Sequence, residues 1–398
     1  MHMKRIISHI FFAAAVSLAF LSCTTQDDIY KQYVKLGGYD YPAKPIHLST
    51  SSGFKRVVVR WEKPMDPAVK TCRLFWDNYK DSVELDYAKY PDGKVQVDLG
   101  DLQDRSYSFN IVNYDANGNK SLASEIIAAP YGDNWMASRP ERAILSARMN
   151  GSDAVVVMSK ATDEMVATQF RYKNRTGAWV VLDKQLKPGE NEVVFPDAQP
   201  GKRFEYSSSF CPKSGLDTVW RSWLKTQDGI SYELNGRRWS VSATDGQVFG
   251  ENTPDKIFDG KNLSGCRWHS SKSESIKLLF PKILSVDTQT SPGNEYAFTG
   301  FRLCESTEAA SLRYIKNVSI YVGSNPYDPN DASWLDHFGN PFLTAVLNTS
   351  VAEQEFNVTT AVSGRYLSLV FPDSWSKDDG YIDLWELVPY GYLPAQAD

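Results

Sequence analysis

Carboxylates, histidines and cysteines are the residues of this chain that could do chemistry, and their spacing does not favour catalysis. The adjacent acidic pairs Asp27-Asp28 and Asp378-Asp379 lie in polar segments, whereas a glycosidase holds its two carboxylates on separate strands of a cleft. The sequence has no Gly-x-Ser-x-Gly elbow, no His-Glu-x-x-His helix and no phosphate-binding glycine loop. We therefore expect a protein that is not an enzyme. Beyond the N-terminal segment the only histidines are His47, His269 and His337.

Four cysteines lie beyond residue 23, and their spacing does not indicate a zinc site. Cys72, Cys211, Cys266 and Cys304 form no Cys-x-x-Cys motif and have no histidine cluster near them. Cys266 and Cys304 are the one pair expected to share a domain, so a disulfide between them stays open. Buried free thiols are the favoured alternative.

The N-terminus has the composition of an export signal that ends at a cysteine. A basic start is followed by an almost uninterrupted apolar run, residues 6–21, and Cys23 precedes a polar stretch. The segment resembles a bacterial lipoprotein signal. That resemblance implies that residues 1–22 are removed and that the thiol of Cys23 is acylated. An ordinary cleaved signal or a membrane anchor are the alternatives, although the run is marginal for a spanning helix.

Residues 23–44 are polar and predict a lipidated tether between the anchor and the first domain. Asp27-Asp28 is similar to the signal by which gut Bacteroidota send lipoproteins to the outer face, and a solvated tether is the alternative. We expect a protein held by lipid in the cell outer membrane and exposed at the cell surface. With 43 Lys and Arg against 48 Asp and Glu, the net charge is −5. Nucleic-acid binding would favour a basic patch, so we expect no such partner.

Short strands separated by turn residues dominate from residue 45 onward and predict an all-β protein. Residues 94–99 and 107–111 alternate strictly between apolar and polar side chains, and Asp115-Ala-Asn-Gly-Asn119 is a strong hairpin turn. With Trp61 as a core residue and Tyr107 in a late strand, residues 45–130 resemble a fibronectin type III domain.

A second set of strands, in residues 131–228, predicts another sandwich of the same kind. The segments Tyr114–Ser121, Tyr131–Asn134 and Asp217–Val219 together resemble an uncharacterised tandem region of surface lipoproteins of gut Bacteroidota. This resemblance covers residues 42–226.

Residues 229–393 carry a different series of motifs. Asp259-Gly260, Arg267-Trp-His-Ser270, Gly364-Arg-Tyr-Leu367 and a late Glu386 occur in that order. The series resembles the discoidin domain, also called the coagulation factor V/VIII type C domain. The resemblance implies a galactose-binding-like β jelly roll as the third domain.

Discoidin-like domains usually hold a structural calcium in the Asp-Gly loop, and the resemblance places its carboxylates at Asp259 and Glu386. Oxygen ligands suit this hard cation. Cys266 departs from the pattern, because the family usually has a threonine there and a thiol is a poor calcium ligand. The alternative is that Asp259 only caps its turn by accepting local backbone hydrogen bonds.

Many discoidin-like domains bind glycans with loops at one end of the sandwich. An aromatic ring and a few polar groups suit a sugar, which has apolar CH faces and polar edges. Each aromatic ring has an alternative role as a lid over the core. Glu305 stands where related sugar binders often carry an arginine. The candidate ligand-binding residues are His269, Trp334, Trp375, Tyr381, Arg302 and Arg313.

The order of the parts predicts a lipid-anchored cell-surface protein that binds carbohydrate, as an accessory to glycan capture or uptake. Its partners would be a polysaccharide or host glycan, the outer-membrane lipid and an uptake complex. The alternative is a non-catalytic protein-interaction or scaffold component of an outer-membrane complex with no sugar site.

Overall fold

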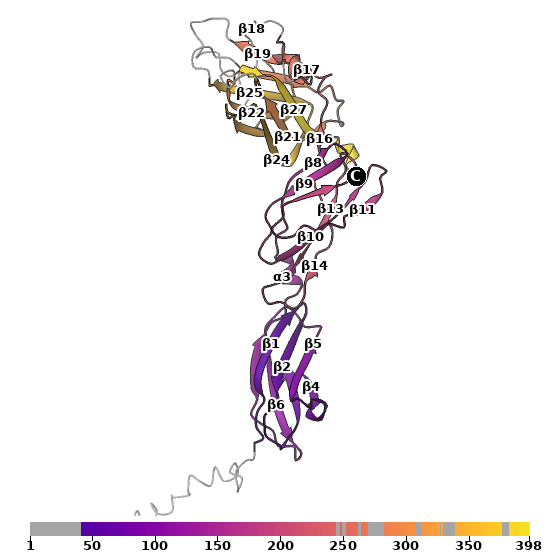
Figure 1. The fold of residues 1–398 in the computed structure, drawn as a ribbon, viewed down its shortest axis with the longest axis vertical. Helices are drawn as coiled ribbons and strands as arrows, with labels where there is room; N and C mark the ends of the chain where they lie inside the picture. Colours follow the sequence, from indigo (N-terminus) through magenta and orange to yellow (C-terminus); the bar gives the residue numbers. More distant parts are fainter. Residues whose placement is uncertain are drawn as a thin grey trace, which may run out of the picture. The chain divides into compact units, whose positions relative to one another are not determined.

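The structure is a computed structural model, and it describes residues 41–243, 247–248, 252–261, 264–269, 282–307, 313–326, 328, 339–375 and 382–398. It divides into two compact units, the first ending at Trp135 and the second beginning at Met136. Both units consist of β-strands with a few short helical turns (Figure 1), so the predicted all-β class is confirmed. Within the described ranges, no helix is long and apolar enough to cross a membrane. Cys23 and the predicted signal lie outside these ranges.

The first unit is a sandwich of two antiparallel sheets, with the strand orders β1-β2-β5 and β4-β3-β6-β7. Val57, Val59 and Trp61 of β2 all point into the core between the two sheets. Its strands are β1 Ile46–Gly53, β2 Arg56–Glu62, β3 Val69–Trp76, β4 Asp81–Asp86, β5 Lys94–Leu99, β6 Tyr107–Asp115 and β7 Ser124–Ala128.

A chain of hydrogen bonds satisfies the polar atoms in this first core. Trp61 Nε1 donates to the hydroxyl of Tyr87 at 3.1 Å, and that hydroxyl donates to Asn113 Oδ1 at 2.8 Å. The Gln103 amide donates to the hydroxyl of Tyr107 at 3.0 Å, as in the tyrosine corner of immunoglobulin-like sandwiches. The predicted fibronectin-like sandwich is therefore confirmed in its tyrosine as well as its sheets.

The second unit begins with another small sandwich. Its sheets have the orders β12-β9-β8 and β11-β10-β13-β14, and β15 also pairs with β13. Stacked aromatic rings fill its core, with the centroids of Tyr172 and Phe195 4.6 Å apart. Its strands are β8 Ile144–Asn150, β9 Asp153–Met158, β10 Met165–Lys173, β11 Trp179–Val181, β12 Glu192–Phe195, β13 Glu205–Phe210, β14 Val219–Trp220 and β15 Leu224–Lys225.

A jelly roll of three sheets completes the second unit. The sheet orders are β16-β27-β21-β24, β17-β20-β25-β22-β23 and β18-β19-β26. Its strands are β16 Tyr232–Glu233, β17 Ser240–Ala243, β18 Gln247–Val248, β19 Cys266–His269, β20 Lys282–Asp287, β21 Tyr296–Cys304, β22 Ile315–Gly323, β23 Leu343–Val346, β24 Glu353–Gly364, β25 Tyr366–Ser374, β26 Ile382–Leu384 and β27 Glu386–Tyr392. The predicted discoidin-like jelly roll is thus confirmed as a fold.

A bulge in β21 sets which of its side chains face the core of the jelly roll. The pairing of β21 with both neighbours shifts between Phe298 and Gly300. Phe298 and Phe301 are therefore both fully buried although they are three residues apart. A Cβ on Gly300 would lie 2.4 Å from the carbonyl oxygen of Phe356, so the close strand approach requires a glycine at this position.

All four cysteines of the described chain are free thiols. Burial raises the pKa of Cys72 and of Cys304 to about 11, and it raises the pKa of Cys266 further. Cys266 and Cys304 lie in the strands β19 and β21 with no bond between them. The favoured prediction, buried free thiols, holds for this pair.

Candidate functional site

The predicted calcium residues Asp259 and Glu386 meet at one end of the jelly roll. Asp259 follows the turn η2, Pro254–Phe258, and Glu386 begins β27. Asp259 Oδ1 accepts from the Lys261 amide at 2.8 Å, and its Oδ2 accepts from Ser264 Oγ at 2.5 Å. The cap that formed the alternative to calcium is therefore present. Burial, followed by the charge of Asp259, raises the pKa of Glu386 to about 7 although the amides of Gly260 and Lys261 oppose this.

The chemistry of this pair fits a cation. Glu386 Oε2 is buried and has no hydrogen-bond partner among the described residues, which is uncommon for a buried oxygen. Two acidic groups close enough to repel each other would both gain from a positive ion between them. The described residues hold no group of three or more His, Cys, Asp and Glu side chains suited to a metal. Backbone carbonyl and water oxygens would therefore have to complete a calcium site.

Glu305 lies close to this loop but takes no part in its surface. It is fully buried, and its Oε1 accepts from the Ile315 amide at 2.8 Å. Burial raises the pKa of Glu305 to about 8, and the charge of Asp383 acts in the same direction. Because the side chain is internal, Glu305 cannot contribute to a sugar-binding surface as an arginine at this position would.

Trp375 and Arg313 come together at the loops that follow β25 and precede β22. The Trp375 amide donates to the carbonyl of Tyr314 at 2.7 Å, and its Nε1 donates to the carbonyl of Leu347 at 3.3 Å. Trp375 is 44 % exposed, and Lys316 Nζ lies 5.1 Å from the centroid of its ring. The ring is therefore anchored by its edge and open to solvent.

Arg313 uses its guanidinium group to hold the same loops together. Its Nε donates to the carbonyl of Ser306 at 2.8 Å, and its Nη1 donates to the carbonyl of Thr349 at 2.7 Å. Arg313 therefore fixes the segments around Trp375 rather than presenting a free cation. Side-chain positions of the other predicted loop residues, His269, Trp334 and Tyr381, lie outside the described part of the chain.

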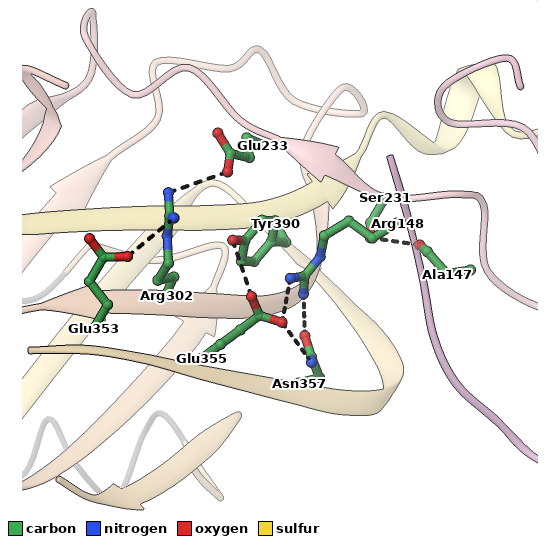
Figure 2. Close-up of polar contacts among 9 residues, drawn as sticks. All are labelled: Ala147, Arg148, Ser231, Glu233, Arg302, Glu353, Glu355, Asn357 and Tyr390. Carbon is green, nitrogen blue, oxygen red and sulfur yellow. Dashed lines mark hydrogen bonds and ion pairs between the residues drawn. The ribbon is translucent and has the colours of Figure 1, made fainter. Parts of the chain in front are cut away.

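Arg302 lies elsewhere, on the outer face of the sheet β16-β27-β21-β24. It lies between Glu233 at 3.3 Å and Glu353 at 3.5 Å, as Figure 2 shows. Its charge is neutralised there. The structure thus separates Arg302 from Trp375 and places it beside a polar cluster that joins the jelly roll to the second sandwich.

Sequence reasoning missed the centre of that cluster, which is Arg148 of β8 (Figure 2). Its guanidinium group lies 3.2 Å from the centroid of the Tyr390 ring, forms an ion pair with Glu355 at 2.5 Å and donates to Asn357. Burial alone would raise the pKa of Glu355, but Arg148 holds it below its ordinary value. These partners lie more than 200 residues from Arg148 in the sequence, so no local signal could have identified them.

The connector between the second sandwich and the jelly roll, residues 231–233, forms hydrogen bonds with strands of both domains. The Ser231 amide donates to the Ala147 carbonyl of β8 at 2.9 Å, and the Met149 amide donates back to Ser231 at 2.8 Å. The next two residues form β16 and pair with β27. The carboxylate of Asp398 returns to the second sandwich and pairs with Lys225 at 2.6 Å. The jelly roll and the second sandwich are thus tied by backbone and side chains alike.

Comparisons with known proteins give a family match for the N-terminal part. Residues 23–219 match a protein family described as a domain of unknown function. No curated protein matches the chain in sequence.

Among solved structures, a family 32 carbohydrate-binding module of NanJ from C. perfringens in complex with galactose is 13 % identical, with a TM-score of 0.31; it covers 40 % of this chain and 99 % of its own. A SusE-like protein is 10 % identical, with a TM-score of 0.29, and the match covers 87 % of this chain and 97 % of that protein's chain. A two-domain fibronectin type III segment of chicken tenascin is 16 % identical, with a TM-score of 0.20, and the match covers 46 % of this chain and 99 % of the tenascin segment. Residues 23–219 of this chain therefore match a family of unknown function, and a jelly roll follows them toward the C-terminus.

Proposed function

We propose that this protein is a non-catalytic, lipid-anchored cell-surface protein whose jelly roll binds carbohydrate. The observation that carries the proposal is Trp375, a large ring held at its edge by Leu347 and exposed at a loop end. Such a ring can pack against the CH face of a sugar while nearby polar groups bind its hydroxyls. The discoidin-like sequence motifs support the same ligand class.

In this proposal the two small sandwiches act as a spacer between Cys23 and the jelly roll. The lipid on Cys23 would hold the protein at the outer membrane, where an uptake complex would use the captured glycan. Calcium would bind at Asp259 and Glu386 and brace the loop that carries them, since both carboxylates lie beside one another there. The ion would supply only positive charge, and it would take no part in a reaction.

A glycan array probed with residues 24–398 tests the proposal. We expect binding to at least one neutral plant or host glycan, with the affinity of Trp375→Ala about twofold to tenfold weaker, since stacked rings are worth about 0.5–1.5 kcal/mol beyond the area they bury. Trp220→Ala is a matched control, because Trp220 is similarly exposed on the second sandwich. Absence of binding to every glycan, or equal binding by both variants and the parent, would refute it.

One observation favours a second candidate function, a scaffold role without a sugar site. Glu305 occupies a position where an arginine would serve a sugar, and it is fully buried. A pull-down from solubilised outer membrane separates the two functions. A stoichiometric protein partner that survives excess free sugar would favour the scaffold role.

A further inference from the structure

A polar pocket lies between the second sandwich and the jelly roll, away from the loops around Trp375. We call it the junction pocket, and its volume is about 370 Å³. Both domains contribute to its lining. Its polar lining includes Ser146, Arg148 and Tyr206 from the sandwich and Thr299, Asn357 and Thr359 from the jelly roll.

Two lining groups have hydrogen-bonding capacity that the protein does not use. Thr299 Oγ1 and Arg148 Nε are both buried without a hydrogen-bond partner among the described residues. Other atoms of Arg148 are fully engaged with Glu355 and Asn357. Because both atoms lie beneath the accessible surface, the polar groups that a ligand in the pocket would meet are the exposed side chains of Asn357 and Thr359.

The charges around the junction pocket indicate that this ligand is neutral. Arg148 is paired with Glu355, and Lys225 is paired with the carboxylate of Asp398. Asp228 accepts from the hydroxyl of Tyr392 at 3.0 Å and from the Ala361 amide at 3.1 Å. No surplus cation remains in the lining to attract an anion, and both oxygens of the Asp228 carboxylate already accept hydrogen bonds.

The apolar part of the lining suits a saccharide. Ile144, Leu145 and Val358 line the junction pocket together with its hydroxyl and amide groups. A sugar ring has the same division, with apolar CH groups and polar hydroxyls. At about 370 Å³, the pocket lies near the lower end of small-molecule sites, which span roughly 300–1,000 Å³. Its size therefore fits one or two sugar rings.

Backbone and side-chain contacts between the two domains hold the residues that line the pocket. Ser231, which also lines the pocket, is bonded on both sides to β8, and Tyr232 continues into the sheet of the jelly roll. Arg148, which pairs with Ser231 in a β-bridge, adds a side-chain contact there, because its guanidinium group lies 3.2 Å from the centroid of the Tyr390 ring. A pre-formed site loses little conformational entropy on binding.

We propose that the junction pocket is a second carbohydrate site, which takes a neutral saccharide of one or two rings and uses groups from both domains. It does not depend on the site around Trp375, and either site can exist without the other. Either a sugar or water alone could occupy the junction pocket, so the test has to separate the two.

The test follows the methyl NMR signals of Ile144, Ala147 and Val358 in the chain of residues 24–398. Galactose, glucose, mannose and N-acetylglucosamine are titrated one at a time to about 50 mM, which detects a Kd in the millimolar range, about −4 kcal/mol. We expect at least one sugar to shift these signals in a saturable way, while sodium sulfate does not. If no sugar shifts them, the pocket holds water only and the proposal is overturned; a saturable sulfate shift would overturn its neutral character.

Variants localise the effect. Thr359 is exposed at the pocket, so Thr359→Trp should fill it and weaken binding at least about tenfold. Thr360→Trp, one residue along the same strand and outside the lining, is the matched control and should bind as the parent does.

The same titration on Trp375→Ala keeps the two sites distinguishable. Shifts that survive in Trp375→Ala and vanish in Thr359→Trp support the junction pocket whatever the glycan array finds. Shifts that vanish only in Trp375→Ala would assign all binding to the loop end and overturn this proposal. Equal binding by Thr359→Trp and Thr360→Trp would overturn it as well.

Discussion

Replacing Glu386 with glutamine tests the electrostatics of the loop that holds Asp259. Burial and the charge of Asp259 raise the pKa of Glu386 to about 7 from an ordinary value of 4.5. Between these two values the folded protein keeps a proton that the unfolded chain has lost. The free energy of unfolding therefore falls as pH rises through this window, and Glu386→Gln, which carries no titrating proton, should lose that part of the dependence.

The size of the effect follows from the shift in pKa. One unit corresponds to about 1.36 kcal/mol, so a shift from 4.5 to about 7 has an upper limit of about 3 kcal/mol. Gly260 and Lys261, whose amides face Glu386, are exposed to solvent, so we discount this to about 1–2 kcal/mol. For a unit of this size that is roughly 3–6 °C in Tm.

Thermal unfolding from pH 4.5 to pH 8, first with EGTA and then with calcium, measures the pH dependence of Tm and the effect of the metal on it. The parent should lose about 3–6 °C more than Glu386→Gln as pH rises in EGTA. Glu305, whose pKa is raised to about 8, titrates in both proteins, so the comparison cancels it. Calcium should raise the Tm of the parent more at pH 8 than at pH 5, because the metal needs the ionised carboxylate. Equal pH slopes would refute the proposed burial of this charge, and equal calcium shifts in both proteins would place the ion elsewhere.

The remaining predictions concern the junction, the first core and the anchor. Arg148→Ala should cost about 2–3 kcal/mol, because it leaves Glu355 half-buried without its cation, and limited proteolysis of residues 226–235 should then accelerate; an unchanged cleavage rate would contradict the contacts in Figure 2. Trp61→Phe should cost about 1–3 kcal/mol in urea unfolding, since it leaves a cavity and removes the donor to Tyr87; a cost below the error of the measurement would show that the core repacks. Cys23→Ala should release a folded, glycan-binding protein from the membrane fraction, and a variant that stays membrane-bound would rule out the lipid anchor.

Much of the fold could be predicted from local patterns. The predicted strand at residues 94–99 coincides with β5, and that at residues 107–111 forms the first part of β6. Both alternate strictly in sequence, and the exposure of their side chains alternates in the same way. The turn predicted at residues 115–119 is also present. Asp115 Oδ1 accepts from the amides of Asn117 and Asn119, and Gly118 has a positive φ of 82°.

What the sequence could not supply are the contacts between distant segments. β24, Glu353–Gly364, exposes much of its surface and shows no apolar run, yet it pairs along β21 and carries Glu355 to Arg148. The bulge at Gly300 breaks the alternation that would have identified the inner face of β21. The role of Glu305 depended on burial, which the family motif at that position does not reveal.

The connector between the second sandwich and the jelly roll has a consequence for insertions and deletions. Residues 231–233 bond to β8 and then to β27 in one continuous extended segment. Adding or removing a single residue here would turn every following side chain to the opposite face, and Glu233 would leave Arg302. Substitutions in this segment are tolerable wherever the backbone bonds persist, but its length is not free to change. Among variants of this chain, the length of residues 231–233 should therefore hold more firmly than the identity of these three residues.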